Sequence, residues 1–88
     1  MAWTIEYAAA AQRQLAKIDK PSARKILDYM DDRVAPAADP RQLGKALSGR
    51  LKGLWRYRVG DLRVLCTIED SRITVVVVEI GHRREVYR

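Results

Sequence analysis

The chain of 88 residues is long enough for one hydrophobic core, and its composition, 48% hydrophobic and 32% charged, excludes a disordered segment; we therefore expect one domain over residues 1–88. The formal charge of +6 lies in the second half, since residues 1–40 carry six basic and six acidic side chains and residues 41–88 carry eleven and five. Positive charge concentrated in one half of the chain favours binding to a polyanionic partner. The alternative is that the charge only keeps the protein soluble.

The first forty residues predict one strand and two helices. Residues 3–7 alternate apolar and polar side chains, as a short strand does. Residues 8–18 are rich in alanine and place apolar side chains at helical spacing. Asp19 can cap a second helix with Pro21 in its first turn, where a missing N–H is tolerated. The buried stripe of this helix would comprise Ile26, Leu27, Met30 and Val34.

Pro36, Pro40 and Gly44 mark a connecting loop, after which the hydrophobic period changes to two. Strands are expected over residues 54–59, 62–69 and 73–80. Gly60-Asp61 suits a type II′ hairpin turn between the first two of them. The sequence therefore predicts an α+β fold of order β-α-α-β-β-β, with two N-terminal helices packed on one face of a small, mainly antiparallel sheet. Residues 81–88 would form a basic tail.

The hairpin turn also predicts which side chains share a face of the sheet. A two-residue loop pairs Arg58 with Arg63. The core face would then carry Trp55, Tyr57, Val59, Leu62, Val64, Cys66 and Ile68. Arg56, Arg58 and Arg63 would share the opposite face, with no acid on the patch. Because directly opposed like charges are unfavourable by ~0.2–1 kcal/mol, this arrangement indicates an anionic ligand. The alternative is that arginine stems simply cover the sheet.

Several kinds of chemistry are excluded by the sequence. The single cysteine, Cys66, allows no internal disulfide and no cysteine metal cluster, and its apolar surroundings predict a buried, inert thiol. No glycine-rich phosphate loop is present, so we expect no cofactor and no metal. The chain has no signal peptide and no apolar run that could span a bilayer, which predicts a cytoplasmic protein without membrane association.

An arginine cluster remains well suited to cleaving RNA. Guanidinium groups bind phosphate oxygens bidentately and stabilise a phosphorane-like transition state. RNA supplies its own nucleophile, the 2′-hydroxyl, so a metal is not required. The reaction also needs a proton acceptor and a proton donor. His82 and Tyr87 are the candidates near the arginines, with a solvated histidine and a tyrosine anchoring the tail as the alternatives.

Three segments together resemble the RelE branch of the RelE/ParE toxin superfamily. They are residues 54–65 (LWRYRVGDLRVL), residues 81–88 (GHRREVYR) and the lead into the second strand, LGKAL at 43–47 followed by LKGLW at 51–55. The likeness covers essentially the whole chain. It implies the toxin of a type II toxin–antitoxin system, a metal-independent endoribonuclease that cuts mRNA in the ribosomal A site. The implied partners are a RelB-like antitoxin, mRNA and the ribosome with its 16S rRNA, and operator DNA only through the antitoxin complex.

The resemblance implies catalytic roles at four positions, Arg58, Arg63, Arg83 and Tyr87. Arg63 would stabilise the scissile phosphate, Arg83 would stabilise or protonate the leaving group, and Tyr87 would stack on the substrate and assist the 2′-hydroxyl. RNA binding would involve Lys45, Lys52, Arg56, His82 and Arg84. Lysines commonly occupy the positions of Arg56 and Arg58 in this family. Because arginine has a pKa above ~12, Arg58 is assigned charge stabilisation and the proton acceptor stays unassigned.

Two other functions fit parts of the sequence. A ParE-like toxin shares this fold and inhibits DNA gyrase without cutting RNA. A non-enzymatic nucleic-acid-binding module would need only the arginines of the sheet. The combination of a basic strand with an Arg…Tyr tail favours the nuclease.

Overall fold

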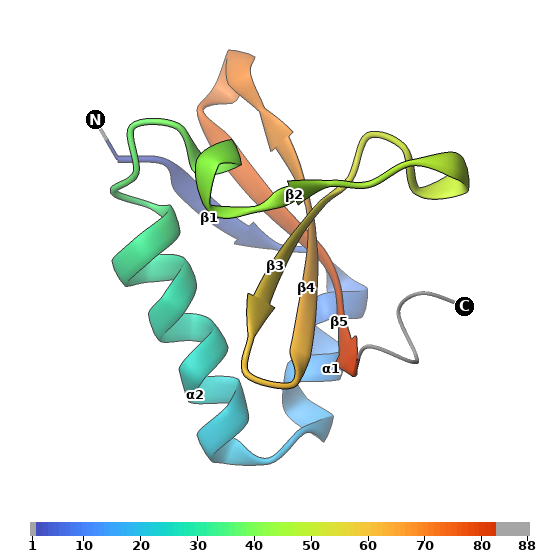
Figure 1. Ribbon diagram of the computed structural model, residues 1–88. Helices are drawn as coiled ribbons and strands as arrows, with labels where there is room; N and C mark the ends of the chain where they lie inside the picture. Colours follow the sequence, from blue (N-terminus) through green and yellow to red (C-terminus); the bar gives the residue numbers. More distant parts are fainter. Residues whose placement is uncertain (1, 83–88) are drawn as a thin grey trace.

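The computed structural model, which describes residues 2–82, places two helices on one face of a five-stranded sheet (Figure 1). The first half comprises β1 (Thr4–Tyr7), α1 (Ala9–Lys17) and α2 (Lys20–Tyr29), which continues into one π-helical turn (Met30–Val34). Short 3₁₀ turns (Pro40–Leu43 and Gly49–Leu51) flank a two-residue strand, β2 (Lys45–Ala46). The meander follows as β3 (Trp55–Val59), β4 (Leu62–Glu69), a 3₁₀ turn (Asp70–Arg72) and β5 (Thr74–His82).

The sheet has the strand order β1-β5-β4-β3-β2. Only β1 and β5 run parallel, in register from Thr4 opposite Thr74 to Tyr7 opposite Val77, and the other neighbours are antiparallel. The predicted α+β fold with a mainly antiparallel sheet is therefore confirmed. The sequence did not predict β2, because two residues are too few to show an alternating pattern. β5 extends to His82, so Gly81 and His82 belong to a strand and not to the tail.

The second helix begins as the sequence predicted. The Asp19 side chain accepts a hydrogen bond from the Ser22 N–H at 3.0 Å, and Pro21 lies in the first turn. These backbone hydrogen bonds lower the pKa of the Asp19 carboxyl, because they favour its charged form. The helix and its π-helical extension bury Ile26, Met30 and Val34 completely. α2 thus packs its apolar stripe against the sheet, next to β3.

The hydrophobic core fills the space between the helices and one face of the sheet. The residues buried in it are Ala11, Ile26, Met30, Val34, Tyr57, Leu62, Val64, Cys66, Val75, Val77 and Ile80. Tyr57 is its largest member, and the side-chain hydroxyl donates a hydrogen bond to the carbonyl of the buried Pro40 at 2.8 Å. A Cβ atom at Gly44 would lie 3.0 Å from the Tyr57 ring, so only glycine lets the loop approach so closely. This aromatic ring therefore joins the loop before β2 to the sheet.

A β-bulge interrupts the pairing of β4 with β5. Cys66 pairs with Val77 and Leu65 pairs with Glu79, so Val78 is the extra residue. The bulge shifts the alternation by one position, which directs Ile80 to the helices and Glu79 to the opposite face. Past Val77, β5 no longer pairs with β1, and the Ile80 N–H donates to the Gln14 side chain of α1 at 2.6 Å. Helix α1 thereby holds β5 directly after the bulge.

None of the helices within residues 2–82 is long and apolar enough to cross a membrane.

Two buried tyrosine hydroxyls predict opposite responses to the same substitution. We expect Tyr57→Phe to lower the free energy of unfolding by about 1–3 kcal/mol, because it leaves the Pro40 carbonyl buried without its donor. The Tyr7 hydroxyl is buried without a hydrogen-bond partner, and burial raises its pKa to about 12, so Tyr7→Phe should leave stability unchanged or higher. Urea unfolding of both variants measures the difference. A greater loss in Tyr7→Phe than in Tyr57→Phe would contradict this account.

Candidate nucleic-acid interface

The β3–β4 hairpin has the register that its turn predicted. Arg58 pairs with Arg63, between the neighbouring pairs Val59 with Leu62 and Tyr57 with Val64. Gly60 has a φ of 60° and Asp61 has a negative φ, the combination that the two central residues of a type II′ turn adopt. The turn thus places the two arginines side by side on the face of the sheet that points away from the helices.

We call this surface the arginine face and define it by Lys45, Arg56, Arg58 and Arg63. Lys45 pairs with Arg56 across β2 and β3, which adds a fourth basic side chain beside the three arginines. Lys45 and Arg58 are exposed and Arg56 is half-buried. Next to Arg63, the paired position on β5 is Gly81, which has no side chain. The face therefore presents basic groups from three consecutive strands.

Arg63 differs from its neighbours in being buried, with only 5% of its surface exposed. The sequence placed it on one face with Arg56 and Arg58 and did not indicate that it is buried. Nη1 donates to the carbonyl oxygens of Leu62 at 3.2 Å and Gly60 at 3.5 Å, so the guanidinium folds back along the hairpin backbone. Its Nε is buried without a hydrogen-bond partner, and no acid of residues 2–82 forms an ion pair with it. A buried cation with so few partners is suited to receive an anion.

Glu79 contradicts the prediction that the face contains no acid. Because of the bulge, it pairs with Leu65 and lies on the same side of the sheet as Arg63. Its side chain is half-buried. Simple alternation from the core residue Val77 would have placed Glu79 in the core, and nothing in the run of valines reveals where the extra residue falls. The bulge is the reason that sequence reasoning missed this position.

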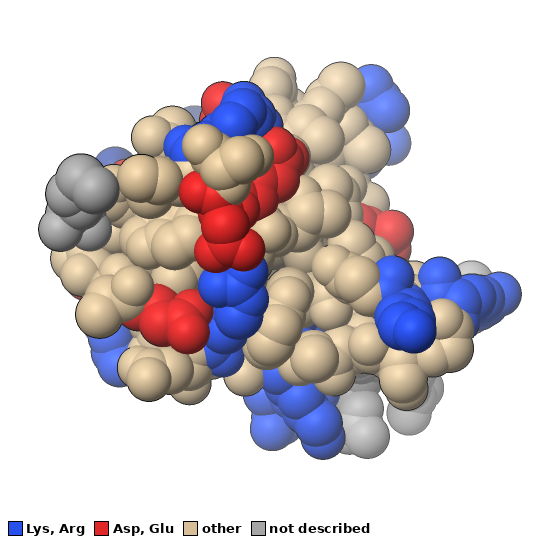
Figure 2. Space-filling view, turned by 90° about the horizontal axis from the view of Figure 1, so that it is seen from above, with Lys and Arg blue, Asp and Glu red and all other residues tan. Residues whose placement is uncertain are grey.

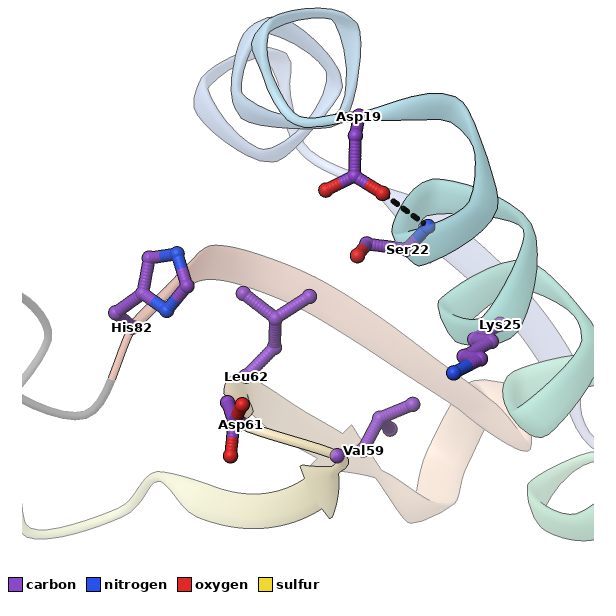
Figure 3. Close-up of a pocket in the computed structure, with 8 residues that line it drawn as sticks. Asp19, Ser22, Lys25, Val59, Asp61, Leu62 and His82 are labelled. Atoms are coloured by element: carbon purple, nitrogen blue, oxygen red, sulfur yellow. Dashed lines mark hydrogen bonds between the residues drawn. The ribbon is translucent and has the colours of Figure 1, made fainter.

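His82 lies on the other face of the sheet, apart from Arg58 and Arg63. It pairs with Leu62, and Figure 3 shows that both side chains point to the side of the helices whereas Asp61 points away. His82 lines a pocket of about 360 Å³ between the hairpin and the start of α2, together with Asp19, Ser22 and Lys25. A second pocket of about 280 Å³ adjoins His82 on the side of α1. The expected grouping of His82 with the arginines is therefore wrong, since the end of β5 directs it elsewhere.

The remaining candidates lie outside the face or outside the described residues. Lys52 is exposed in residues 47–54, a loop that leaves the sheet between β2 and β3 and closes with a hydrogen bond from the Leu47 N–H to the Leu54 carbonyl, 3.0 Å. In Figure 1 this loop projects away from the side on which α2 lies. Arg83, Arg84 and Tyr87 fall outside residues 2–82.

Acidic side chains gather at another end of the molecule, around the turn between β4 and β5. There Arg41 bonds to Asp70 at 2.6 Å, and Arg72 bonds to Glu69 at 2.8 Å and to Glu6 at 3.5 Å. Figure 2, a view from above, shows acidic and basic groups in contact over this end of the molecule. It also shows basic groups toward the projecting loop of residues 47–54. Exposed pairs of this kind contribute little stability each, but they leave the positive excess on the rest of the surface.

Neither a metal centre nor a reactive thiol is found among residues 2–82. No group of three His, Cys, Asp or Glu side chains in this range could hold a metal ion. Cys66 is buried, and burial raises the pKa of its thiol far above the usual range, so its thiolate is not available. The charged groups that the described site offers to a ligand are its basic side chains and Glu79.

Comparisons with known proteins agree with this arrangement. The family model for the ParE toxin of the type II toxin–antitoxin system, parDE, matches residues 5–87. Toxin RelG of Mycobacterium tuberculosis is 28% identical over 88 residues, covering 100% of this chain and 99% of that protein. Toxin RelE of the same organism is 31% identical over 85 residues, covering 96% of this chain and 84% of that protein.

Solved structures show the same fold. A chain of the RelBE2 toxin–antitoxin complex of M. tuberculosis superposes with a TM-score of 0.86 at 26% identity, covering 94% of this chain and 100% of that one. The archaeal RelE–RelB complex of Pyrococcus horikoshii OT3 gives 0.65 at 20% identity, covering 94% and 97%. The chain therefore belongs to the RelE/ParE superfamily of type II toxin–antitoxin toxins. Within that superfamily, the two M. tuberculosis relatives named above are Rel toxins, and the chain is RelE-like.

The burial of Arg63 predicts that this residue lowers the stability of the isolated protein. We expect Arg63→Met to raise the free energy of unfolding by about 1–2 kcal/mol, because an apolar side chain replaces a buried charge without an ionic partner among the described residues. Arg58→Met is the matched control, and because Arg58 is exposed its effect should stay within about 0.5 kcal/mol. Urea unfolding tests both, and a lower midpoint for Arg63→Met would rule out a buried charge that destabilises the fold.

Proposed function

We propose that the chain is a ribosome-dependent mRNA endonuclease that binds the RNA backbone on the arginine face. The observation that carries the proposal is the pair Arg58 and Arg63, held side by side by the hairpin, with Arg63 buried and without an acidic partner in residues 2–82. A phosphate would supply the missing acceptor. The phosphate oxygens would accept hydrogen bonds from the guanidinium N–H groups that have no partner among the described residues.

The proposed reaction is an internal transesterification. The 2′-oxygen attacks the adjacent phosphorus, the bond to the 5′-oxygen of the next nucleotide breaks, and the products end in a 2′,3′-cyclic phosphate and a 5′-hydroxyl. Arg58 and Arg63 would stabilise the charge that develops on the phosphate oxygens. The proton of the 2′-hydroxyl must leave and the 5′-oxygen must gain one, so the site also needs acid–base groups. The chemistry requires no metal.

Other residues take supporting roles in the proposal. Lys45 and Arg56 border the same pair and would bind neighbouring phosphates, and Lys52 would extend the contact along the projecting loop. The family resemblance assigns Arg83 to the leaving group, Tyr87 to the substrate base and the 2′-hydroxyl, and Arg84 to RNA binding. His82 would contact RNA or the ribosome only from the helix side of the sheet.

The ribosome would position the mRNA for cleavage. The arginine face offers charge from regularly spaced strands but no evident means of reading bases, so free RNA would bind in many orientations. We therefore propose that cleavage takes place in the ribosomal A site, with the 16S rRNA as part of the contact surface, and that naked RNA is cut poorly.

An antitoxin is the second proposed partner. Two of the similar structures are toxin–antitoxin complexes, RelBE2 and the archaeal RelE–RelB. We propose that a RelB-like antitoxin neutralises this chain, and that operator DNA is bound only through the resulting complex. The site of action would be the cytoplasm.

Gyrase inhibition is the alternative function, because the matching family model is that of the ParE toxin. Such a toxin would not need the buried Arg63 beside three further basic side chains on one face of the sheet. The relatives that cover nearly the whole chain are Rel toxins, which also supports the nuclease.

Cleavage of actively translated mRNA tests the proposal. We expect wild-type protein to produce ribosome-dependent cuts, detected by primer extension, and almost none on the same RNA without ribosomes. Arg63→Ala should lower the cleavage rate by about 10²–10³-fold, the effect expected for removing one group that stabilises the transition-state charge. Arg24→Ala is the matched control, because Arg24 is an exposed arginine of α2 paired with Asp28, and it should cut at the wild-type rate.

The outcomes separate the competing functions. Intact mRNA together with gyrase-dependent DNA breaks would establish the alternative. Neither effect would leave a nucleic-acid-binding module without enzymatic activity, and rapid cutting of naked RNA would contradict the proposed role of the ribosome.

A further inference from the structure

The bulge at Val78 gives the arginine face a carboxylate. Glu79 pairs with Leu65, and Gly81, two residues on, pairs with Arg63. Glu79 and Arg63 are therefore diagonal neighbours on one face, and their Cα atoms are expected to lie roughly 7–8 Å apart. Since Gly81 carries no side chain, no other side chain of β5 lies between Glu79 and the position opposite Arg63. Bulges often redirect a side chain next to an active site.

The Glu79 carboxylate forms no ion pair within residues 2–82. Every other strand acid of the described chain is in such a pair: Glu69 with Arg72, and Glu6 with the same arginine. The charged side chains on the same side of the sheet are Lys45 from β2, Arg56 and Arg58 from β3, Arg63 and Glu69 from β4, and Glu6 from β1. A half-buried carboxylate near several cations but without a direct partner keeps its oxygens available to a substrate.

We propose that Glu79 is the proton acceptor for the 2′-hydroxyl of the RNA, an inference that rests on the proposed nuclease function. The O–H bond of the 2′-hydroxyl breaks and its proton moves to a Glu79 oxygen as the 2′-oxygen bonds to phosphorus. The bond to the 5′-oxygen then breaks, and that oxygen takes a proton from water. Arg63 stabilises the charge on the phosphate between them.

No other described residue is placed as well for this role. Arginine holds its proton too tightly to act as a base at neutral pH. His82 lies on the opposite side of the sheet. Glu69 is on the correct face but about 20 Å from Arg63 along β4. Asp61 points away from the helices but is exposed at the turn, beyond the row of Arg58 and Arg63.

Single-turnover cleavage of ribosome-bound mRNA tests the proposal. Glu79→Gln keeps the size of the side chain and removes its basicity, and we expect the rate to fall by about 10²–10⁴-fold. Asp61→Asn, an exposed acid of the adjoining hairpin turn, and Glu69→Gln, a distant acid of the same face, should cleave at the wild-type rate. Binding of Glu79→Gln to ribosomes that carry 2′-O-methyl mRNA should stay within about twofold of wild type, which shows that the variant folds and docks.

The pH dependence distinguishes a base from a residue that merely orients Arg63. The wild-type rate should depend on pH, as a step that needs a proton acceptor does, and Glu79→Gln should lose this dependence. A Glu79→Gln variant with the wild-type rate, or with a reduced rate and an unchanged pH profile, would overturn the role of Glu79 alone. If wild-type protein itself leaves the mRNA intact, the proposed nuclease function fails instead.

Discussion

The pairing of Arg58 with Arg63 across a tight hairpin is the constraint on which the candidate site depends. Two like charges opposed on a sheet are unfavourable, and a slip of one residue would move them into the core and their apolar neighbours into water. The buried side chains on the other face, Tyr57 and Val64 among them, prevent that slip. The free energy of the core therefore holds an arrangement that the arginines by themselves would not adopt.

The bulge at Val78 couples the core to the same surface. It places Ile80 among the buried side chains, and in doing so it places Glu79 on the face of the sheet that carries Arg63. Gln14 of α1 accepts the Ile80 N–H, so a helix on one side of the sheet stabilises the backbone that directs a carboxylate on the other. Packing between the helices and the sheet therefore positions both the basic groups and Glu79 on the opposite face.

Much of this structure could be predicted from local pattern. The hairpin register followed from Gly60-Asp61, and the start of α2 from Asp19 and Pro21, because turn and cap residues act over a few positions. The burial of Arg63 and the faces of Glu79 and His82 were missed. The burial of Arg63 depends on how its long side chain lies along the hairpin backbone. The faces of Glu79 and His82 depend on an extra residue within a run of valines. The spacing of residues in the sequence indicates neither.

The most direct measurement is the structure of this protein on a ribosome whose A-site codon carries 2′-O-methyl groups, which block the nucleophile without removing the backbone charge. The proposed site predicts that the phosphate next to the modified ribose lies on the arginine face, within hydrogen-bonding distance of the Arg63 guanidinium and with the ribose directed toward Glu79. Binding of the mRNA on the helix side, near His82 and the pockets beside it, would contradict it.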